Sequence, residues 1–163
     1  MAKAYSPLPH ASELWELFDY KPLTGELVWK RPTSNRVKKG DVAGAKGREG
    51  GRDLRLHGRL YRLHRLIWCW VTAQDPGTSE VDHRDRNRGN NRFWNLRLGT
   101  RAQNMWNTPA RGYRQMPNGR YFSTIRVGGD SPIYLGSFDT AEEAGAAYAK
   151  AAAELHGEFA CAE

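Results

Sequence analysis

Cysteine is scarce in this sequence, which has two among its 163 residues. Cys69 and Cys161 form no Cys-x-x-Cys pair, so a zinc ribbon built from such pairs is excluded and a disulfide framework is not expected. Cys69 falls within an apolar run, which predicts a buried thiol. A run of about 18 apolar residues, long enough to cross a bilayer, is also missing, and no signal peptide is apparent. These absences predict a cytosolic protein without a membrane partner.

Apolar residues are few as well. They make up 39% of the chain, and the mean hydropathy is -0.75. That content is low for one large core, and a chain of 163 residues corresponds to one or two small domains. Six tryptophans and seven tyrosines can fill small cores with large side chains. We therefore expect small packed units.

Acidic residues are outnumbered by basic ones, which gives a formal net charge of +7 and a pI of about 9.6. This balance favours a polyanionic partner such as nucleic acid, although charge alone fits a basic soluble protein equally well. Residues 81–108 carry six arginines and two aspartates, whereas residues 139–163 carry six acidic side chains and one lysine. The distribution predicts basic segments followed by a solvated acidic face.

Residues 1–80 predict a strand-rich segment that ends in a helix. Residues 26–29 follow a Thr-Gly turn and predict a short strand, while residues 52–62 alternate apolar and charged side chains around a His57-Gly58 turn, as in a hairpin. Residues 64–71 form a continuous apolar run that periodicity alone does not assign to helix or strand. A helix is favoured because one of its faces would collect Leu63, Leu66, Ile67 and Trp70.

A different order of elements is predicted for residues 81–108. Val81-Asp82-His83 is typical of the end of a strand, and a long polar loop separates it from a second short strand at residues 96–98. Thr100-Arg-Ala-Gln103 matches the capping box that starts a helix, and Pro109 keeps that helix short. The predicted order is strand, loop, strand and short helix.

The polar residues of this segment point to hydrolysis of nucleic acid. Asp82 offers a hard oxygen ligand suited to Mg²⁺ or Mn²⁺, and His83 titrates near neutral pH and can take a proton from water. Asn95 precedes the second strand, where its amide could bond the backbone across the base of the loop. Adjacent residues on a regular strand face opposite sides, so Asp82 and His83 can serve one phosphate only if the strand bends or ends there.

The run HRLIW at residues 64–68, followed by VDHRDRNRGNNRFWNLRLGTRAQNMWN at residues 81–107, resembles the HNH endonuclease family in its phage and intron-homing branch. The spacing of Asp-His, Asn and Asn carries the resemblance. It implies a ββα-metal core at residues 81–108 that holds one Mg²⁺ or Mn²⁺ ion and leaves 5′-phosphate and 3′-hydroxyl ends. The roles it implies are general base for His83, loop brace for Asn95, and metal ligand for Asp82 and Asn104.

The other polar residues nearby receive simpler interpretations. The arginines of the loop are expected to contact DNA phosphates, namely Arg84, Arg86, Arg88 and Arg92. The remaining asparagines are interpreted as loop or surface residues, because asparagine is frequent in turns, and these are Asn87, Asn90, Asn91 and Asn107. His64 could reach the site or pack at the start of its helix, and packing is favoured. His156 is interpreted as a surface residue.

A boundary at residues 109–115 precedes a second segment of mixed structure. Residues 121–127 and 133–138 are strand-like. Thr140-Ala-Glu-Glu143 is a capping box, and the helix it starts carries an apolar stripe rich in alanine. Small side chains allow such a helix to lie close against a sheet.

The motifs Gly112-Tyr-Arg, Gly119-Arg-Tyr-Phe and Tyr134-Leu-Gly-Ser-Phe, followed by the alanine-rich helix, resemble the AP2 DNA-binding domain over residues 111–160. The resemblance implies three antiparallel strands packed on one helix, with the sheet set in the major groove. The positions that it implies contact DNA are Arg114, Arg120, Tyr121 and Arg126. Plant members often carry tryptophan where this chain has Tyr121 and Tyr134, so the resemblance implies no base preference.

The sequence therefore predicts an α+β protein with a strand-rich lead-in, a ββα-metal nuclease core and a three-stranded antiparallel sheet with one helix. The expected activity is metal-dependent nicking of double-stranded DNA by a homing-type enzyme of phage or intron origin. We expect a monomer without a protein partner, in the cytoplasm of a host cell. Two alternatives stay open: a DNA-binding regulator with an inactive nuclease core, and a nuclease specific for RNA or branched DNA.

Overall fold

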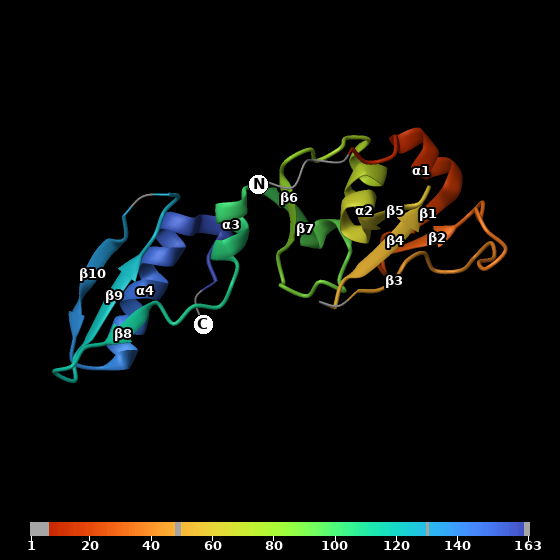
Figure 1. The fold of residues 1–163 in the computed structure, drawn as a ribbon. Coiled ribbons are helices and arrows are strands. Elements are labelled where there is room, and N and C mark those ends of the chain that lie inside the picture. The colour runs from red at the N-terminus through yellow and green to blue at the C-terminus, as the bar shows by residue number, and fades with distance from the viewer. Residues whose placement is uncertain (1–6, 48–49, 130, 162–163) are drawn as a thin grey trace. The chain divides into compact units, whose positions relative to one another are not determined.

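The computed structural model describes residues 7–47, 50–129 and 131–161, which form a mixed α and β structure (Figure 1). Antiparallel sheets of two or three strands alternate with helices, which confirms the expected α+β class. The chain divides into two compact units, and the division falls between Gly99 and Thr100. Within the described residues, no helix is both long enough and apolar enough to cross a membrane.

The N-terminal unit begins with a helix and a β-hairpin. Helix α1 (Ala11–Leu17) leads directly into β1 (Phe18–Lys21), which pairs antiparallel with β2 (Glu26–Trp29). The predicted strand at residues 26–29 is confirmed. β1 was not predicted, because a strand of four residues presents only two inward side chains, Phe18 and Tyr20, and two positions do not define a period.

A second sheet supplies the predicted hairpin. β4 (Arg52–Leu56) and β5 (Arg59–Arg62) pair antiparallel, and β3 (Ala45–Lys46) adds to the edge of β4. The turn between β4 and β5 is left-handed at His57 (φ 49°) and at Gly58 (φ 77°), a conformation that glycine adopts without strain. The hairpin and its turn are therefore confirmed.

Helix α2 (Leu63–Thr72) follows β5 without a break, and it occupies the centre of the N-terminal unit. The helix is confirmed, and the face predicted to be apolar buries Leu63, Leu66 and Ile67. α2 packs against α1, β4, β5 and the strand β6 that follows (Figure 1). The indole of Trp70 donates a 3.2 Å hydrogen bond to the carbonyl of Phe18, which ties the helix to the first hairpin.

The last sheet of this unit contains the predicted strand ends. β6 (Glu80–His83) pairs antiparallel with β7 (Leu96–Gly99), with His83 opposite Leu96. The loop between them includes a short 3₁₀ turn, η1 (Phe93–Asn95). The order strand, loop, strand is as predicted.

The C-terminal unit begins with the short helix α3 (Arg101–Trp106), which starts with the predicted capping box. The indole of Trp106 stacks on the imidazole of His156, with ring centroids 4.3 Å apart and planes within 4°. His156 is buried, and its Nε2 bonds the carbonyl of Arg126 at 2.8 Å. The surface position expected for His156 is therefore wrong, since α3 and Arg126 reach it from distant parts of the sequence.

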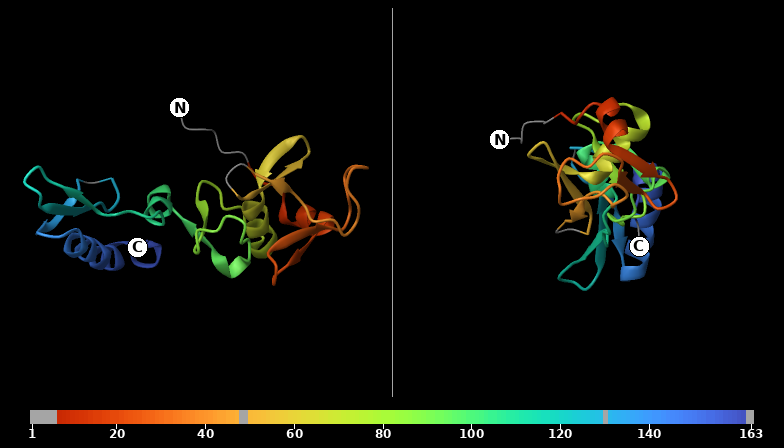
Figure 2. Two further views of the ribbon diagram at one scale, coloured as in Figure 1. Left: turned by 90° about the horizontal axis from the view of Figure 1, so that it is seen from below. Right: turned by 90° about the vertical axis from the view of Figure 1, so that its right-hand side faces the viewer.

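Three antiparallel strands follow: β8 (Tyr113–Gln115), β9 (Tyr121–Ile125) and β10 (Ile133–Phe138), with β9 in the middle. Helix α4 (Ala141–His156) begins with the second capping box and lies along one face of this sheet (Figures 1 and 2). The alanines that face the sheet, Ala144, Ala151 and Ala152, are buried. The small-residue stripe therefore brings the helix close to the sheet, as predicted.

Candidate functional site

Asp82 and His83 lie side by side at the end of β6. Both are buried, and the strand keeps its regular pairing with β7 up to His83, so it ends there rather than bends. Their side chains have different neighbours: Asp82 meets Arg97 of β7, and His83 meets His64 of α2. This arrangement is what alternation along a regular strand requires.

The carboxylate of Asp82 forms a buried ion pair with Arg97. Nε and Nη2 of Arg97 both donate to Oδ2 of Asp82, at 3.0 and 2.9 Å, and the two residues occupy opposite positions on β6 and β7. A buried carboxylate without such a partner would be costly, because removing the partner of a buried charge destabilises a fold by about 3–5 kcal/mol. The pair therefore holds the carboxylate of Asp82 in a fixed orientation. Sequence patterns did not single out Arg97, since its role depends on strand register.

His83 is oriented by a second asparagine of the loop. Its Nε2 lies 2.9 Å from Oδ1 of Asn91, and both side chains are buried. An amide oxygen only accepts hydrogen bonds, so Nε2 of His83 is the donor in this contact. Asn91 is 2% exposed, so its interpretation as one of the loop or surface asparagines was wrong about exposure.

The ring of His64 packs edge-on against that of His83, with centroids 5.1 Å apart and an interplanar angle of 80°. Burial lowers the pKa of His64 to about 3, and electrostatic interactions with His83, Arg65 and Arg62 act in the same direction. His64 is therefore a neutral neighbour of His83 at physiological pH, so it packs at the start of α2 and also reaches the candidate site.

Asn95 joins the two ends of the loop that follows His83. Its Oδ1 accepts from the backbone N–H of Asp85 at 3.1 Å, and its Nδ2 donates to Oδ1 of Asp85 and to the carbonyl of Asn90, both at 2.8 Å. Burial raises the pKa of Asp85, but hydrogen bonds from Asn90, Asn95 and the backbone of Asn87, together with the charge of His83, outweigh it and leave that pKa lowered. The loop is thus closed around an ionised carboxylate.

Comparison with known proteins identifies this region. Residues 61–106, from β5 to the end of α3, match the HNH endonuclease family. These residues therefore resemble an HNH endonuclease domain. A protein of Acanthamoeba polyphaga mimivirus, named as an uncharacterized HNH endonuclease, is 34% identical over 104 residues, which cover 61% of this chain and 55% of the viral protein. The chain thus spans about half the length of the curated relative it matches, and no solved structure matches it.

The loop between β6 and β7 presents three of its four predicted arginines to solvent, namely Arg84, Arg86 and Arg88. Arg92 is instead half-buried: its Nε donates to the carbonyl of Leu23 at 2.7 Å, and its Nη1 donates to Oδ1 of Asn90 at 3.1 Å. Arg92 therefore connects the loop to the turn of the β1–β2 hairpin.

Asn104, the last polar residue of the HNH spacing, lies on α3 and is half-buried within the C-terminal unit. Among the described residues, no group of three or more His, Cys, Asp and Glu side chains is arranged to hold a metal ion. The metal ligands that the sequence implies are Asp82 and Asn104. Because Asn104 is an amide, this pair is not one of those groups of His, Cys, Asp and Glu side chains.

The sheet of the C-terminal unit has one face covered by α4 and one open face. Ser123 and Ile125 of β9 are buried on the covered side. Tyr121 lies two positions before Ser123 on β9, so its side chain is on the same side of the sheet. There its ring lies 5.8 Å from that of Tyr113. The side chains on the open side include Arg114, Phe122 and Tyr134, because Arg114 pairs with Phe122 and Tyr134 pairs with Thr124.

The two other arginines predicted to contact DNA differ in their surroundings. Nε of Arg120 forms an ion pair with Asp139 at 2.8 Å, and its Nη2 donates to the carbonyl of Ser137 at 3.2 Å. Arg126 is exposed just beyond the end of β9. Arg120 is thus held by the sheet itself, whereas Arg126 extends from its edge into solvent.

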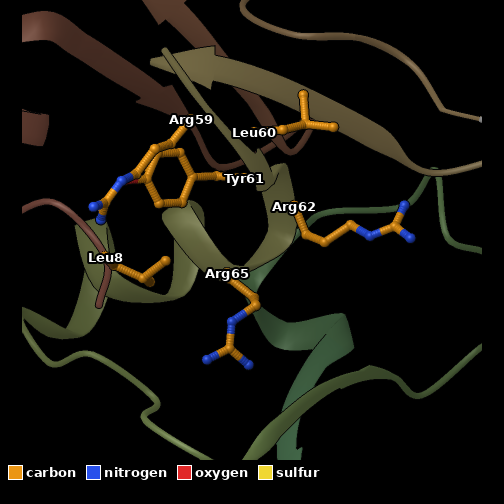
Figure 3. Close-up of a pocket in the computed structure, with 6 residues that line it drawn as sticks. All are labelled: Leu8, Arg59, Leu60, Tyr61, Arg62 and Arg65. Atoms are coloured by element: carbon orange, nitrogen blue, oxygen red, sulfur yellow. The ribbon is translucent and has the colours of Figure 1, made fainter. Parts of the chain in front are cut away.

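A shallow pocket on the N-terminal unit is lined by arginines from β5 and α2 (Figure 3). Its side chains belong to Leu8, Arg59, Leu60, Tyr61, Arg62 and Arg65. Arg65 donates to the carbonyls of Ser79 and Gly77, both at 2.7 Å, and Arg62 bonds Asp53 at 3.2 Å. The guanidinium groups point in different directions in Figure 3, so they do not converge on one anion.

Proposed function

We propose that the chain is a metal-dependent endonuclease that nicks double-stranded DNA, of the homing type found in phages and introns. The observation that carries this proposal is the hydrogen bond from Nε2 of His83 to Asn91, because it orients a buried histidine within the region that matches the HNH endonuclease family. A histidine that ends a strand and has its tautomer fixed is suited to general-base catalysis. We further propose that the protein acts as a monomer, for which one site gives one nick.

In the proposed reaction, Nδ1 of His83 takes a proton from a water molecule as its oxygen attacks the phosphorus. The new bond joins this oxygen to phosphorus, and the bond from phosphorus to the 3′ oxygen breaks. The leaving oxygen takes up a proton from solvent, which gives a 3′-hydroxyl and a 5′-phosphate. His83 returns its proton to solvent before the next turnover.

We propose that Asp82 and Asn104 bind the metal ion, which rests on their spacing in the sequence. Carboxylate and amide oxygens are hard donors that suit Mg²⁺ or Mn²⁺, and the ion pair with Arg97 fixes the orientation of the carboxylate of Asp82. A bound divalent ion would stabilise negative charge on the phosphate and on the leaving oxygen. The bonds that Asn95 makes to Asp85 and Asn90 support its role as the brace of the loop.

We propose that DNA is bound by two sets of basic residues. The exposed loop arginines Arg84, Arg86 and Arg88 would contact phosphates next to the site, with Arg92 positioned behind them. The sheet of the C-terminal unit would act as an AP2-like reader of the major groove. The exposure of Arg114 and Arg126 supports this role most directly, whereas Arg120 and Tyr121 contact neighbours within the unit.

The test is incubation of supercoiled plasmid with purified protein in Mg²⁺ or Mn²⁺, with His83→Ala beside it. We expect the wild type to convert the plasmid to nicked circles and the His83→Ala variant to nick it roughly a hundredfold or more slowly. In EDTA neither protein should nick the plasmid. Arg59→Ala, which changes an exposed arginine away from β6, serves as the matched control and should keep its activity. Salt-dependent binding without any nicking would overturn the proposal in favour of a regulator. Preferential cleavage of RNA or branched DNA would overturn the choice of substrate.

A further inference from the structure

The loop segment that carries Asn91 is held in place by a part of the chain that precedes the HNH match. The hydroxyl of Tyr20, on β1, donates to the backbone carbonyl of Asn91 at 3.1 Å and accepts from the backbone N–H of Phe93 at 2.8 Å. Tyr20 is buried. A single hydroxyl thus forms one hydrogen bond on each side of Arg92, as the donor to Asn91 and as the acceptor from Phe93.

The turn of the same hairpin presses directly on this segment. A Cβ at Gly25 would lie 2.5 Å from the backbone N of Arg92 and 2.6 Å from the carbonyl carbon of Asn91, closer than real Cβ contacts come. Arg92 returns the contact by donating from Nε to the carbonyl of Leu23. Backbone atoms cannot move aside as a flexible side chain can, so only glycine fits where the hairpin meets the loop.

The hairpin is itself fixed to the core. Phe18 and Trp29 are buried against each other with ring centroids 4.5 Å apart, and the ring of Tyr20 lies 5.7 Å from that of Trp70 on α2. Since α2 also carries His64, which packs on His83, the same helix supports both the base and the hairpin. The position of Asn91 is therefore set by packing and does not depend on the loop alone.

We propose that the β1–β2 hairpin is a brace for the catalytic histidine, and that Tyr20 and Asn91 are positioning residues for the nuclease reaction. The hairpin fixes the backbone of Asn91, and the amide oxygen of Asn91 accepts from Nε2 of His83, which orients the imidazole for the proposed proton transfer at Nδ1. This inference rests on the proposed function for its kinetic consequence, but the arrangement of hydrogen bonds can be measured without cleavage.

Two variants test the brace. Asn91→Ala removes the acceptor, and Asn91→Asp retains an oxygen at the same place. Long-range ¹H–¹⁵N spectra of the metal-free, full-length protein report which nitrogen of His83 carries the proton. We expect the Nε2-H form in the wild type and in Asn91→Asp, and a mixture of the two neutral tautomers in Asn91→Ala. An unchanged His83 spectrum in a folded Asn91→Ala protein would overturn the role of Asn91.

Tyr20→Phe tests the hairpin, because it keeps the ring and removes only the hydroxyl. We expect the single-turnover rate of nicking to fall about 3- to 10-fold, as for loss of a neutral hydrogen bond, with DNA affinity unchanged. Tyr61→Phe, on β5 and packed against the same core, is the control and should keep the wild-type rate. If Tyr20→Phe does not fold, the Asn91 pair decides the proposal. If the wild type never nicks DNA, the proposed function fails, while the His83 spectra of the Tyr20 and Asn91 variants still decide whether the brace exists.

Discussion

At the scale of the residue, the chemistry of His83 depends on side chains that contact its ring, among them Asn91 and His64. Asn91 bonds Nε2, and His64 packs edge-on against the ring. An exposed histidine exchanges freely between its two tautomers, whereas one hydrogen-bonded through Nε2 to an oxygen keeps its proton there. The surroundings of the residue, more than its identity, make it suitable as a base.

The neutral state of His64 predicts a loss of stability in mild acid. Burial, followed by electrostatic interactions with His83, Arg65 and Arg62, holds the pKa of His64 at about 3 in the folded protein, whereas an unfolded histidine titrates near about 6.5. Between these values the unfolded chain binds more protons, so the free energy of unfolding rises with pH through this window and falls as the pH drops below about 6.5.

We expect His64 to lower the free energy of unfolding by on the order of 2 kcal/mol near pH 4.5, relative to neutral pH. The variant His64→Phe should therefore flatten the dependence of Tm on pH between about 4 and 6.5. Thermal unfolding in EDTA across this range is the measurement. His10→Asn, which replaces the exposed histidine at the N-cap of α1 with another capping residue, is the control and should keep the wild-type slope. Equal slopes for wild type and His64→Phe would contradict the assignment.

At the scale of the element, short segments are held by one or two specific contacts. α3 has only six residues, and it is anchored by its capping box and by the stack of Trp106 on His156. The sheet of the C-terminal unit is likewise joined to α4 where the backbone at Gly112 passes the ring of Tyr148. Helices and strands of this length depend on such contacts because their own hydrogen bonds are too few to sustain them.

The approach at Gly112 predicts a steep penalty for one added methyl group. A Cβ there would lie 1.9 Å from the ring of Tyr148, and the residue has a left-handed φ of 73°. Gly112→Ala should therefore destabilise the protein by more than the ~1–3 kcal/mol typical of overpacking. Gly119→Ala is the matched control, since it has a similar φ of 84° with nothing within 4 Å of its Cβ, and only backbone strain is expected. Urea unfolding compares the two, and equal losses would show that the ring contact does not matter.

At the scale of the whole molecule, basic residues outnumber acidic ones up to residue 138, whereas residues 139–163 carry six acidic side chains and one lysine. The net charge of +7 gives a long-range attraction for DNA that salt weakens. The loop after β6 contributes exposed arginines, and the C-terminal unit contributes the arginines of its sheet. We expect binding to depend on both sets, and cleavage to depend on β6 and the loop that follows it.

If the open face of the C-terminal sheet binds DNA, its arginines should contribute to the salt dependence of the DNA affinity. If Arg114 contacts a phosphate, Arg114→Ala should reduce the slope of log K against log salt by about 0.9. Lys150→Ala, an equal loss of one charge from an exposed position on α4, should change the affinity little and leave the slope unchanged. Fluorescence anisotropy with labelled duplex from low to moderate salt measures both. Identical slopes for the two variants would show that the open face does not contact DNA.

Local signals in the sequence determined much of this protein. The hairpin at residues 52–62, the helix at 64–71 and both capping boxes are confirmed, because each depends on residues a few positions apart. The spacing of Asp82, His83, Asn95 and Asn104 indicated the HNH family for the same reason, since a motif is a pattern of near neighbours.

Only the tertiary structure decided what surrounds the candidate site. The pair of Asp82 with Arg97 depends on the register of two strands, and the contact of Asn91 with Tyr20 joins residues 71 positions apart. Asparagine is equally common in exposed turns and in closed polar networks, so its residue type did not reveal that Asn91 is buried against His83. Sequence spacing thus determined which residues could do chemistry. Packing of the first hairpin and α2 against the loop decided how His83 is held, because hydrogen bonds between distant segments exist only once the chain has folded.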